Sequence, residues 1–310
     1  MDDLDKARIS RRDFLKSLGL GAAAAAAASL LPETTALAAE APAGPTWGML
    51  IDLTRCTGCN SCALACKEAN GLPQIPGKVP AALEADTYTF VEAFQVANLR
   101  GEIVTRYVKR QCMHCLEAAC VSACPAAAMH SSGEGPVIYR ASRCLGCRYC
   151  EVACPFAIPR FNWDNSITPT INKCWMCYER LKEGEEPACV AACPTGAIRF
   201  GRRDDLLAQA HARIASHPDR YVDHVFGESE VGGTSVLYLS DVPFDRLGFP
   251  ANLPLVAPPK QTEKILYKLP YVIFGMAAFM TGTALYTHRK PAVAVPVEAD
   301  AATDAPDKEE

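Results

Sequence analysis

The chain has 310 residues, and 16 of them are cysteine, whereas the rest of the composition is ordinary for a globular protein, with 49% hydrophobic and 21% charged residues. This length allows about two domains of about 100–200 residues, so a core can form without disulfide staples, and the composition excludes intrinsic disorder and collagen-like structure. The formal net charge of −4 gives no sign of a basic surface for nucleic acid. The excess of cysteine is therefore the feature that needs an explanation.

The first 38 residues have the layout of an export signal. A polar, partly basic start precedes an uncharged stretch over residues 18–31, which is too short to span a bilayer, and a small-residue cleavage site at residues 36–38. Arg11 and Arg12 in the polar start resemble the twin-arginine pattern of the Tat pathway, which exports folded proteins. The alternative is a chance arginine pair before an apolar helix. We expect a signal peptide over residues 1–38 and a mature protein at the periplasmic face of the inner membrane.

A second apolar segment lies near the C-terminus. Residues 269–287 carry no charge, and 19 residues in a helix that rises about 1.5 Å per residue are enough to cross a bilayer. The alternative is a buried core helix. We expect one C-terminal transmembrane helix over residues 264–288, which anchors the protein, and a disordered acidic tail over residues 289–310 on the cytoplasmic side.

The cysteines fall into four quartets with short internal spacings. Quartets one and three have the C-x2-C-x2-C-x3-C spacing of bacterial ferredoxins, whereas quartets two and four keep the opening C-x2-C and the closing C-x3-C around a longer middle gap. The quartets are Cys56, Cys59, Cys62 and Cys66; Cys112, Cys115, Cys120 and Cys124; Cys144, Cys147, Cys150 and Cys154; and Cys174, Cys177, Cys189 and Cys193.

Three kinds of chemistry use closely spaced cysteines. An even number of cysteines in an exported chain is normally a disulfide framework, and four-cysteine zinc sites also use C-x2-C pairs. Zinc sites need two pairs, however, whereas here a C-x3-C-P ending recurs: Pro125, Pro155 and Pro194 follow three quartets, and Lys67 follows the first. A cubane cluster needs four thiolates that converge on one small body, so the spacing predicts four [4Fe-4S] clusters rather than staples or zinc.

Internal repetition supports this prediction and indicates the fold. Segments 56–66 and 144–154 are versions of one unit, each with glycine before the second cysteine, where the backbone must pass close to inorganic sulfur. Short helices are expected to start within the quartets and to end near each Cys-Pro. Short apolar strands flank the loops at residues 49–53, 137–139 and 197–200. The sequence therefore predicts an α+β fold with two ferredoxin-like modules over residues 39–205.

Two further segments lie outside the quartets. Residues 67–111 form an insertion between quartets one and two, with strands expected at residues 88–91 and 103–108, and we expect it to cover a cluster or to meet a partner subunit. Residues 206–263 carry glycine and proline turns and a strand at residues 235–239. We expect this segment to be an extension that links the modules to the membrane surface.

Basic residues lie directly before the quartets. They are Arg55, Arg143 and Lys173, each before the first cysteine of a quartet, and Lys109 and Arg110 just before the remaining quartet. A positive side chain near a cluster favours its more negative, reduced form and raises its reduction potential, whereas the alternative is a set of solvated surface residues. His114 and Trp175, inside C-x2-C gaps, are expected to pack beside the clusters rather than to bind metal.

These motifs resemble a known family, the four-cluster ferredoxin-type electron-transfer subunits of membrane-bound oxidoreductases. Segments 56–66, 112–125, 144–155 and 174–194 carry the resemblance. The twin-arginine signal, the C-terminal apolar segment and the stretches at residues 109–115, 146–150 and 232–243 are similar to the iron–sulfur subunit of hydrogenase-2-type periplasmic [NiFe] hydrogenases.

The resemblance implies which cysteines share a cluster. Quartets one and four would form one module and quartets two and three the other, with the closing cysteines exchanged inside each module. The implied ligand sets are Cys56, Cys59, Cys62 and Cys193 for cluster 1; Cys112, Cys115, Cys120 and Cys154 for cluster 2; Cys144, Cys147, Cys150 and Cys124 for cluster 3; and Cys174, Cys177, Cys189 and Cys66 for cluster 4.

The sequence contains no nucleotide loop and no nucleophile beside a general base, so we expect an electron-transfer subunit without a catalytic centre of its own. The resemblance implies that electrons enter from the large and small subunits of a [NiFe] hydrogenase that oxidises H2. They would then cross four [4Fe-4S] clusters in an anaerobic respiratory chain and leave to a multi-helix, quinone-reactive membrane subunit.

Two alternatives stay open. The chain could be the β subunit of a membrane-bound formate dehydrogenase or another molybdopterin oxidoreductase. In the commonest such complexes the signal is on the catalytic subunit, so Arg11 and Arg12 favour the hydrogenase. The other alternative is a metal-storing or structural zinc protein, which would contain zinc without acid-labile sulfide.

Overall fold

The computed structural model describes residues 44–163 and 171–288. These residues fall into two units, one that ends at Lys260 and one that begins at Gln261. The predicted signal peptide with Arg11 and Arg12 and the predicted acidic tail lie outside the described residues, so both stay predictions.

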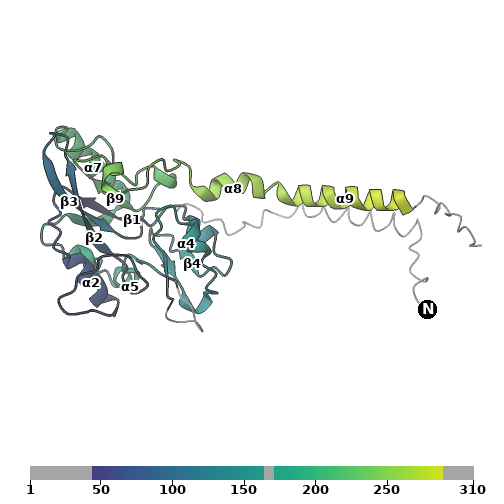
Figure 1. The fold of residues 1–310 in the computed structure, drawn as a ribbon, viewed down its shortest axis with the longest axis horizontal. Coiled ribbons are helices and arrows are strands. Elements are labelled where there is room, and N and C mark those ends of the chain that lie inside the picture. Colours follow the sequence, from purple (N-terminus) through teal and green to yellow (C-terminus); the bar gives the residue numbers. More distant parts are fainter. Residues whose placement is uncertain (1–43, 164–170, 289–310) are drawn as a thin grey trace, which may run out of the picture. The chain divides into compact units, whose positions relative to one another are not determined.

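A three-stranded sheet organises the first unit (Figure 1). The middle strand, β1 (Trp47–Asp52), pairs antiparallel with β8 (Ile198–Arg202) and parallel with β9 (Val236–Leu239). Strands were predicted in all three places. Because β9 comes from residues 206–263, the segment expected to be a linking extension completes the sheet and belongs to the same unit as the cysteine loops.

The two faces of the sheet pack against different partners. Leu50 and Leu237 pack against Leu206 and Ile214 of α7 (Arg203–Ser216), a helix that the sequence analysis did not predict. Since side chains alternate along a strand, the neighbouring residues point to the other face. There, the side chains of Met49, Ile51 and Tyr238 share one buried core with Cys62 and Cys189. The sheet thus presents an apolar floor to quartets one and four.

The predicted insertion contains a β-hairpin. Strands β2 (Phe90–Ala97) and β3 (Ile103–Arg110) pair antiparallel over their full lengths, from Phe90 with Arg110 to Ala97 with Ile103. Val91, Val104 and Val108 pack on the core that contains Cys62. The hairpin therefore covers the module of quartets one and four on the side away from α7, and its last strand leads directly into quartet two.

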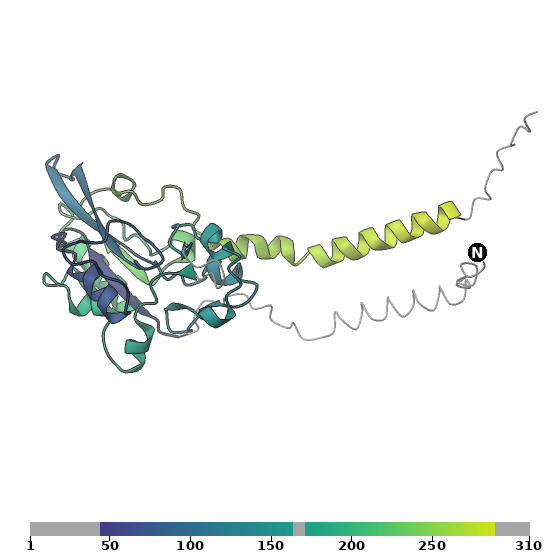
Figure 2. The same cartoon turned by 60° about the horizontal axis from the view of Figure 1, so that its bottom comes forward.

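Short elements carry the quartets, as predicted. The helices are α2 (Ser61–Ala69), α3 (Ala119–Ser122), α4 (Tyr149–Ala153), α5 (Tyr178–Lys182) and α6 (Ala188–Ala191). Two small antiparallel ladders accompany quartets two and three, β4 (Met129–Ser131) with β5 (Val137–Tyr139) and β6 (Arg160–Phe161) with β7 (Ile171–Asn172). Figures 1 and 2 show α4 and β4 together in a lobe beside the one that contains β1, β2 and α2.

The remaining elements are short 3-10 helices and the two C-terminal helices. Three short 3-10 helices are η1 (Ala141–Arg143), η2 (Glu230–Gly232) and η3 (Phe244–Leu247). They are followed by α8 (Pro258–Leu266) and α9 (Leu269–His288). We predicted a transmembrane helix over residues 264–288. A helix forms there, but within the described ranges no helix combines the length and the apolarity needed to cross a membrane.

Candidate iron–sulfur centres

The four C-x2-C loops share one backbone conformation. The residue before the second cysteine has a positive φ in every loop: 72° at Gly58, 49° at His114, 67° at Gly146 and 57° at Met176. Glycine adopts this conformation freely, whereas a residue with a side chain is strained there. At Gly58 a Cβ atom would also lie 2.4 Å from the ring of Tyr107. Glycine thus occupies a position of positive φ in quartets one and three, whereas quartets two and four reach the same conformation with His114 and Met176. The predicted close approach of the backbone to inorganic sulfur stays a prediction.

This conformation aims backbone N–H groups at sulfur. The N–H of Gly146 donates to Cys144 Sγ at 3.4 Å, and the N–H of Met176 donates to Cys174 Sγ at 3.3 Å. Hydrogen bonds to a thiolate or to cluster sulfur stabilise negative charge. The loops therefore suit anionic ligands.

The closing cysteines are set by the Cys-Pro turns. Ala127, Ala157 and Gly196, each three residues after a closing cysteine, have φ of 49°, 49° and 58°. Beyond the first of these turns, the N–H of Ala128 donates to Cys124 Sγ at 3.2 Å. Since proline cannot continue a helix, the chain turns back over the sulfur.

Quartet one departs from this pattern because Lys67 replaces the proline. Helix α2 continues to Ala69, and the side-chain Nδ2 of Asn70 takes the place of a backbone donor, 3.7 Å from Cys66 Sγ. Lys67 Nζ donates to the carbonyl oxygens of Pro73 at 2.9 Å and Asp86 at 3.0 Å. The substitution changes the turn but keeps a donor on the sulfur.

One predicted ligand set surrounds a single cavity. Cys56, Cys59, Cys62 and Cys193 line the same small cavity, and the side chain of Lys109 forms part of its wall. The closing cysteine of quartet four thus lies with the opening cysteines of quartet one. This is the exchange that the family resemblance implied for cluster 1.

In the other three predicted sets, neighbouring thiols raise one another's pKa. For cluster 2, burial raises the pKa of Cys115, and the nearby thiols of Cys112, Cys120 and Cys154 raise it further.

For cluster 3, burial and then the thiols of Cys124, Cys144 and Cys147 raise the pKa of Cys150 to about 12. The exchanged cysteines, Cys154 for cluster 2 and Cys124 for cluster 3, therefore lie with the sets to which they were assigned.

For cluster 4, burial raises the pKa of Cys66 to about 12, and the thiols of Cys189 and Cys177 contribute. The pKa of Cys174 is raised by burial and next by the thiol of Cys66. The ligand assignment stays a prediction, and within each predicted set the thiols lie near one another.

Shared buried cores indicate the order of the predicted sets. Cys62 of set 1 and Cys189 of set 4 belong to one core. Cys174 of set 4 and Cys112 of set 2 belong to another, together with Cys66. Cys120 of set 2 and Cys150 of set 3 belong to a third. The sets thus form a row in the order 1, 4, 2, 3.

The thiols suit a group that supplies positive charge. Burial raises the pKa of Cys62 to about 11 and that of Cys120 to about 12, so both thiols are protonated at neutral pH until a metal replaces the proton. In the described part of the chain, no three His, Cys, Asp or Glu side chains are placed to hold a single metal ion. The cavity of set 1, the buried thiols and the N–H donors fit iron–sulfur clusters.

Two buried ring nitrogens inside the loops have no hydrogen-bond partner among the described residues. His114 is fully buried, and its Nδ1 accepts a 3.0 Å hydrogen bond from the N–H of Val137, so Nε2 carries the ring proton. Among the described residues, neither this Nε2 nor the buried Nε1 of Trp175 has a hydrogen-bond partner. Trp175 packs against the core that contains Cys120 and Cys150, and the packing of His114 beside a cluster stays a prediction.

Four of the five basic residues before the quartets divide into two groups, and the fifth, Arg110, is partly buried. Arg55 and Arg143 are exposed, and Arg55 Nη2 donates to the carbonyl oxygen of Thr195 at 2.8 Å. Lys109 and Lys173, by contrast, are buried, with 1% and 2% of their surface exposed. The sequence gives all of these basic residues the same predicted role, because no pattern of neighbouring residues indicates that a lysine is buried.

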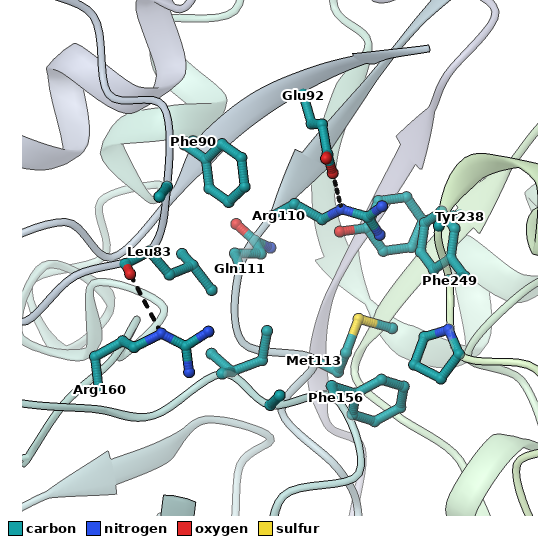
Figure 3. Close-up of a pocket in the computed structure, with 15 residues that line it drawn as sticks. Leu83, Phe90, Glu92, Arg110, Gln111, Met113, Phe156, Arg160, Tyr238 and Phe249 are labelled. Atoms are coloured by element: carbon teal, nitrogen blue, oxygen red, sulfur yellow. Dashed lines mark hydrogen bonds and ion pairs between the residues drawn. The ribbon is translucent and has the colours of Figure 1, made fainter.

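A separate cavity of about 320 Å³ lies beside the start of quartet two (Figure 3). Arg110 Nε donates to Glu92 Oε2 at 3.0 Å, and Arg160 Nε donates to the carbonyl oxygen of Leu83 at 3.2 Å. Aromatic rings, among them Phe156, form its walls. Its lining includes none of the 16 cysteines, so this cavity is distinct from the thiol sets.

Sequence comparisons agree with this geometry. Two family profiles, each described as a 4Fe-4S dicluster domain, match residues 55–128 and residues 103–203. A protein of Nitratidesulfovibrio vulgaris (strain Hildenborough) is 40% identical over 309 residues, which cover 96% of this chain and 82% of that protein. The hydrogenase-2 operon protein HybA of Escherichia coli O157:H7 is 33% identical over 303 residues, which cover 84% of this chain and 90% of HybA.

The chain belongs to the HybA family.

The chain is also similar to iron–sulfur subunits of formate dehydrogenases. The formate dehydrogenase-O iron-sulfur subunit of Escherichia coli K12 is 36% identical over 242 residues, which cover 74% of this chain and 78% of that subunit. This HybA-family chain is therefore an iron–sulfur electron-transfer subunit with 4Fe-4S dicluster domains, related both to HybA and to formate dehydrogenase subunits.

Proposed function

We propose that the chain carries electrons through four [4Fe-4S] clusters between a catalytic unit and a quinone-reactive membrane subunit. The row of four thiol sets is the observation that carries the proposal. Cys59, in the first set of the row, and Cys147, in the last, are exposed, whereas the sets between them are made mostly of buried cysteines. A row with both ends near the surface suits entry of electrons at one end and exit at the other.

The chemistry and the protein contribute different parts. A bound [4Fe-4S] cluster supplies one-electron transfer. The chain supplies four thiolates for each set, N–H donors such as that of Gly146 on Cys144, and a buried surrounding that keeps water from the inner sets. Each of these features tunes the reduction potential.

We propose the large and small subunits of a [NiFe] hydrogenase as the electron donor. The support is the similarity to HybA, which extends over 84% of this chain, together with the predicted twin-arginine signal. Formate dehydrogenase is the second candidate, because the 36% identity to its iron–sulfur subunit covers 74% of the chain. Incubation of the purified complex with H2 or with formate distinguishes the two, since only the true donor bleaches the cluster absorbance.

The cluster count is tested by metal analysis of the purified chain. We expect about 16 iron atoms and about 16 acid-labile sulfides per chain, four of each for every [4Fe-4S] cluster. Zinc in place of iron, or iron without sulfide, would exclude the proposal. Recovery of a multi-helix membrane protein and a catalytic subunit with the tagged chain tests the partners.

The proposed location is the periplasmic face of the inner membrane, and it rests on Arg11 and Arg12. Replacement of both by lysine keeps the charge but alters the twin-arginine pattern, so cluster-loaded precursor should accumulate in the cytoplasm. Fractionation of cells with an antibody against the chain measures this, and undiminished export would show that the arginine pair has no such role.

A further inference from the structure

Two buried lysines lie just before cysteine quartets in the sequence. Lys109 lies three residues before quartet two, and Lys173 directly before quartet four. Only 1% of Lys109 and 2% of Lys173 is exposed. Burial of an ammonium group is costly unless negative charge or hydrogen-bond acceptors surround it. The groups around each lysine therefore indicate which set of thiolates its positive charge stabilises.

Lys109 lies among the thiols of quartets one and four. Its Nζ donates to Gln111 Oε1, and its side chain lines the cavity formed by Cys56, Cys59, Cys62 and Cys193. Its charge also acts on Cys189 and Cys174 of set 4. Although Lys109 leads into quartet two, it faces the module of quartets one and four.

Lys173 shows the reverse exchange. Its Nζ donates to the carbonyl oxygens of Val137, on β5, and of Cys174, the latter at 3.1 Å. Val137 belongs to the buried core that contains Cys120, and the positive charge of Lys173 lowers the pKa of Cys120 and of Cys154, both of set 2. Although Lys173 leads into quartet four, it faces the module of quartets two and three.

Neighbouring side chains follow the same exchange. Met113, in the quartet two loop, packs in the core that contains Cys62 and Cys189. Trp175, in the quartet four loop, packs against the core that contains Cys120 and Cys150. In each of the two segments, therefore, a second side chain also packs in the module of the other quartets.

We propose that Lys109 and Lys173 set the reduction potentials of clusters in exchanged modules: Lys109 those of clusters 1 and 4, and Lys173 that of cluster 2. The inference rests on the proposed function, since it requires that the thiol sets hold clusters. A fixed positive charge stabilises the reduced, more negative cluster. Because both lysines are shielded from water and salt, their effect exceeds that of the exposed Arg55 and Arg143.

The test is a redox titration of the full-length, cluster-loaded protein, followed by EPR spectroscopy. Signals are assigned to modules with Cys62→Ser and Cys120→Ser, which alter cluster 1 and cluster 2. At a fixed electrode potential, Lys109→Met should lower the reduced-to-oxidised ratio of clusters 1 and 4 about tenfold, which is about 59 mV for a one-electron couple. Lys173→Met should lower that of cluster 2 similarly, and each variant should leave the other module unchanged.

Lys67→Met is the matched control. Lys67 is also buried, with 9% exposed, and it is bonded directly to the ligand Cys66, but its Nζ donates to the carbonyl oxygens of Pro73 and Asp86. This variant should leave all four potentials unchanged. Lys109→Arg keeps the charge and should also keep the potentials of clusters 1 and 4 near those of the unaltered protein.

Several results would overturn the inference. They are shifts confined to the module that follows each lysine in the sequence, equal shifts from Lys67→Met, and unchanged potentials in Lys109→Met with all iron retained. If Lys109→Met loses iron, Lys109→Gln is titrated in its place. Loss of iron from both neutral variants but not from Lys109→Arg supports a charge requirement, whereas loss from all three contradicts it. Absence of four clusters from the unaltered protein would instead refute the proposed function.

Discussion

The hydroxyl of Tyr238 donates a 2.6 Å hydrogen bond to the carbonyl oxygen of Lys109. This bond joins β9 to the end of β3, at the residue whose side chain enters the thiols of quartets one and four. Two backbone bonds continue the connection, from the N–H of Val236 to the carbonyl oxygen of Met113 at 3.1 Å and from Ser235 to His114 at 2.9 Å. The segment around β9 therefore holds the start of quartet two in place.

Tyr238→Phe should destabilise the protein. The substitution removes only the hydroxyl and leaves the carbonyl oxygen of Lys109 buried without that donor, which costs about 1–2 kcal/mol. The thermal unfolding midpoint of the cluster-loaded protein should fall, and the EPR signals of clusters 1 and 4 should broaden. An unchanged midpoint would mean that water or another group replaces the hydroxyl.

Gly58→Ala should prevent assembly of cluster 1. The added methyl group would lie 2.4 Å from the Tyr107 ring, at a φ of 72° that alanine disfavours by about 1–2 kcal/mol. We expect about four fewer iron atoms per chain than in the unaltered protein. Gly71→Ala is the control, since Gly71 has a similar φ of 59° but nothing within 4 Å of its added methyl group. Equal iron loss in both variants would contradict a role for the Tyr107 contact.

Cys154→Ser should damage the cluster of the neighbouring loop. Cys154 belongs to quartet three by sequence, but its thiol lies with Cys112, Cys115 and Cys120. The EPR signal of cluster 2 should be lost or converted to that of a three-iron cluster, while the signal of cluster 3 persists. Loss of the cluster 3 signal alone would refute the exchanged ligand sets.

His224 and Glu230 should make stability depend on pH. His224 Nε2 lies 2.7 Å from Glu230 Oε1, and this hydrogen bond raises the pKa of His224 above 6.5. Burial opposes ionisation of Glu230, but the hydrogen bonds from His224 and from the N–H of Gly227 outweigh it and hold its pKa below 4.5.

The His224–Glu230 pair stabilises the fold most at mildly acidic pH. The raised pKa of His224 stabilises the fold below about pH 6.5 and is lost as the pH rises through the folded-state value, whereas the lowered pKa of Glu230 stabilises it above about pH 4.5. His224→Gln should therefore lower the free energy of unfolding most between these pH values, by less than about 1 kcal/mol because His224 is half exposed. A difference in unfolding free energy that stays the same between pH 5 and pH 9 would contradict this pair.

The local features of the cysteine loops could be predicted from the sequence because they depend on near neighbours. The spacing of each quartet and the glycine at position 58 report constraints within a few residues. The pairing of β1 with β9 and the burial of Lys109 could not be predicted, because they depend on segments far apart in the chain. Helix α7 did have a signal, since Leu206, Ala210 and Ile214 recur every four residues on its buried face.

The replacement of proline by Lys67 marks the quartet whose closing cysteine waits longest for its cluster. In the proposed sets, clusters 2 and 3 have all their ligands once Cys154 has been synthesised. Cys66 must remain reduced until Cys189, the last ligand of cluster 4, has been synthesised, and cluster 1 has all its ligands only after Cys193. The predicted ligand sets are thus completed from the centre of the sequence outward. A chain that ends after residue 160 contains all eight predicted ligands of clusters 2 and 3, whereas one that ends before residue 193 lacks a ligand of cluster 1.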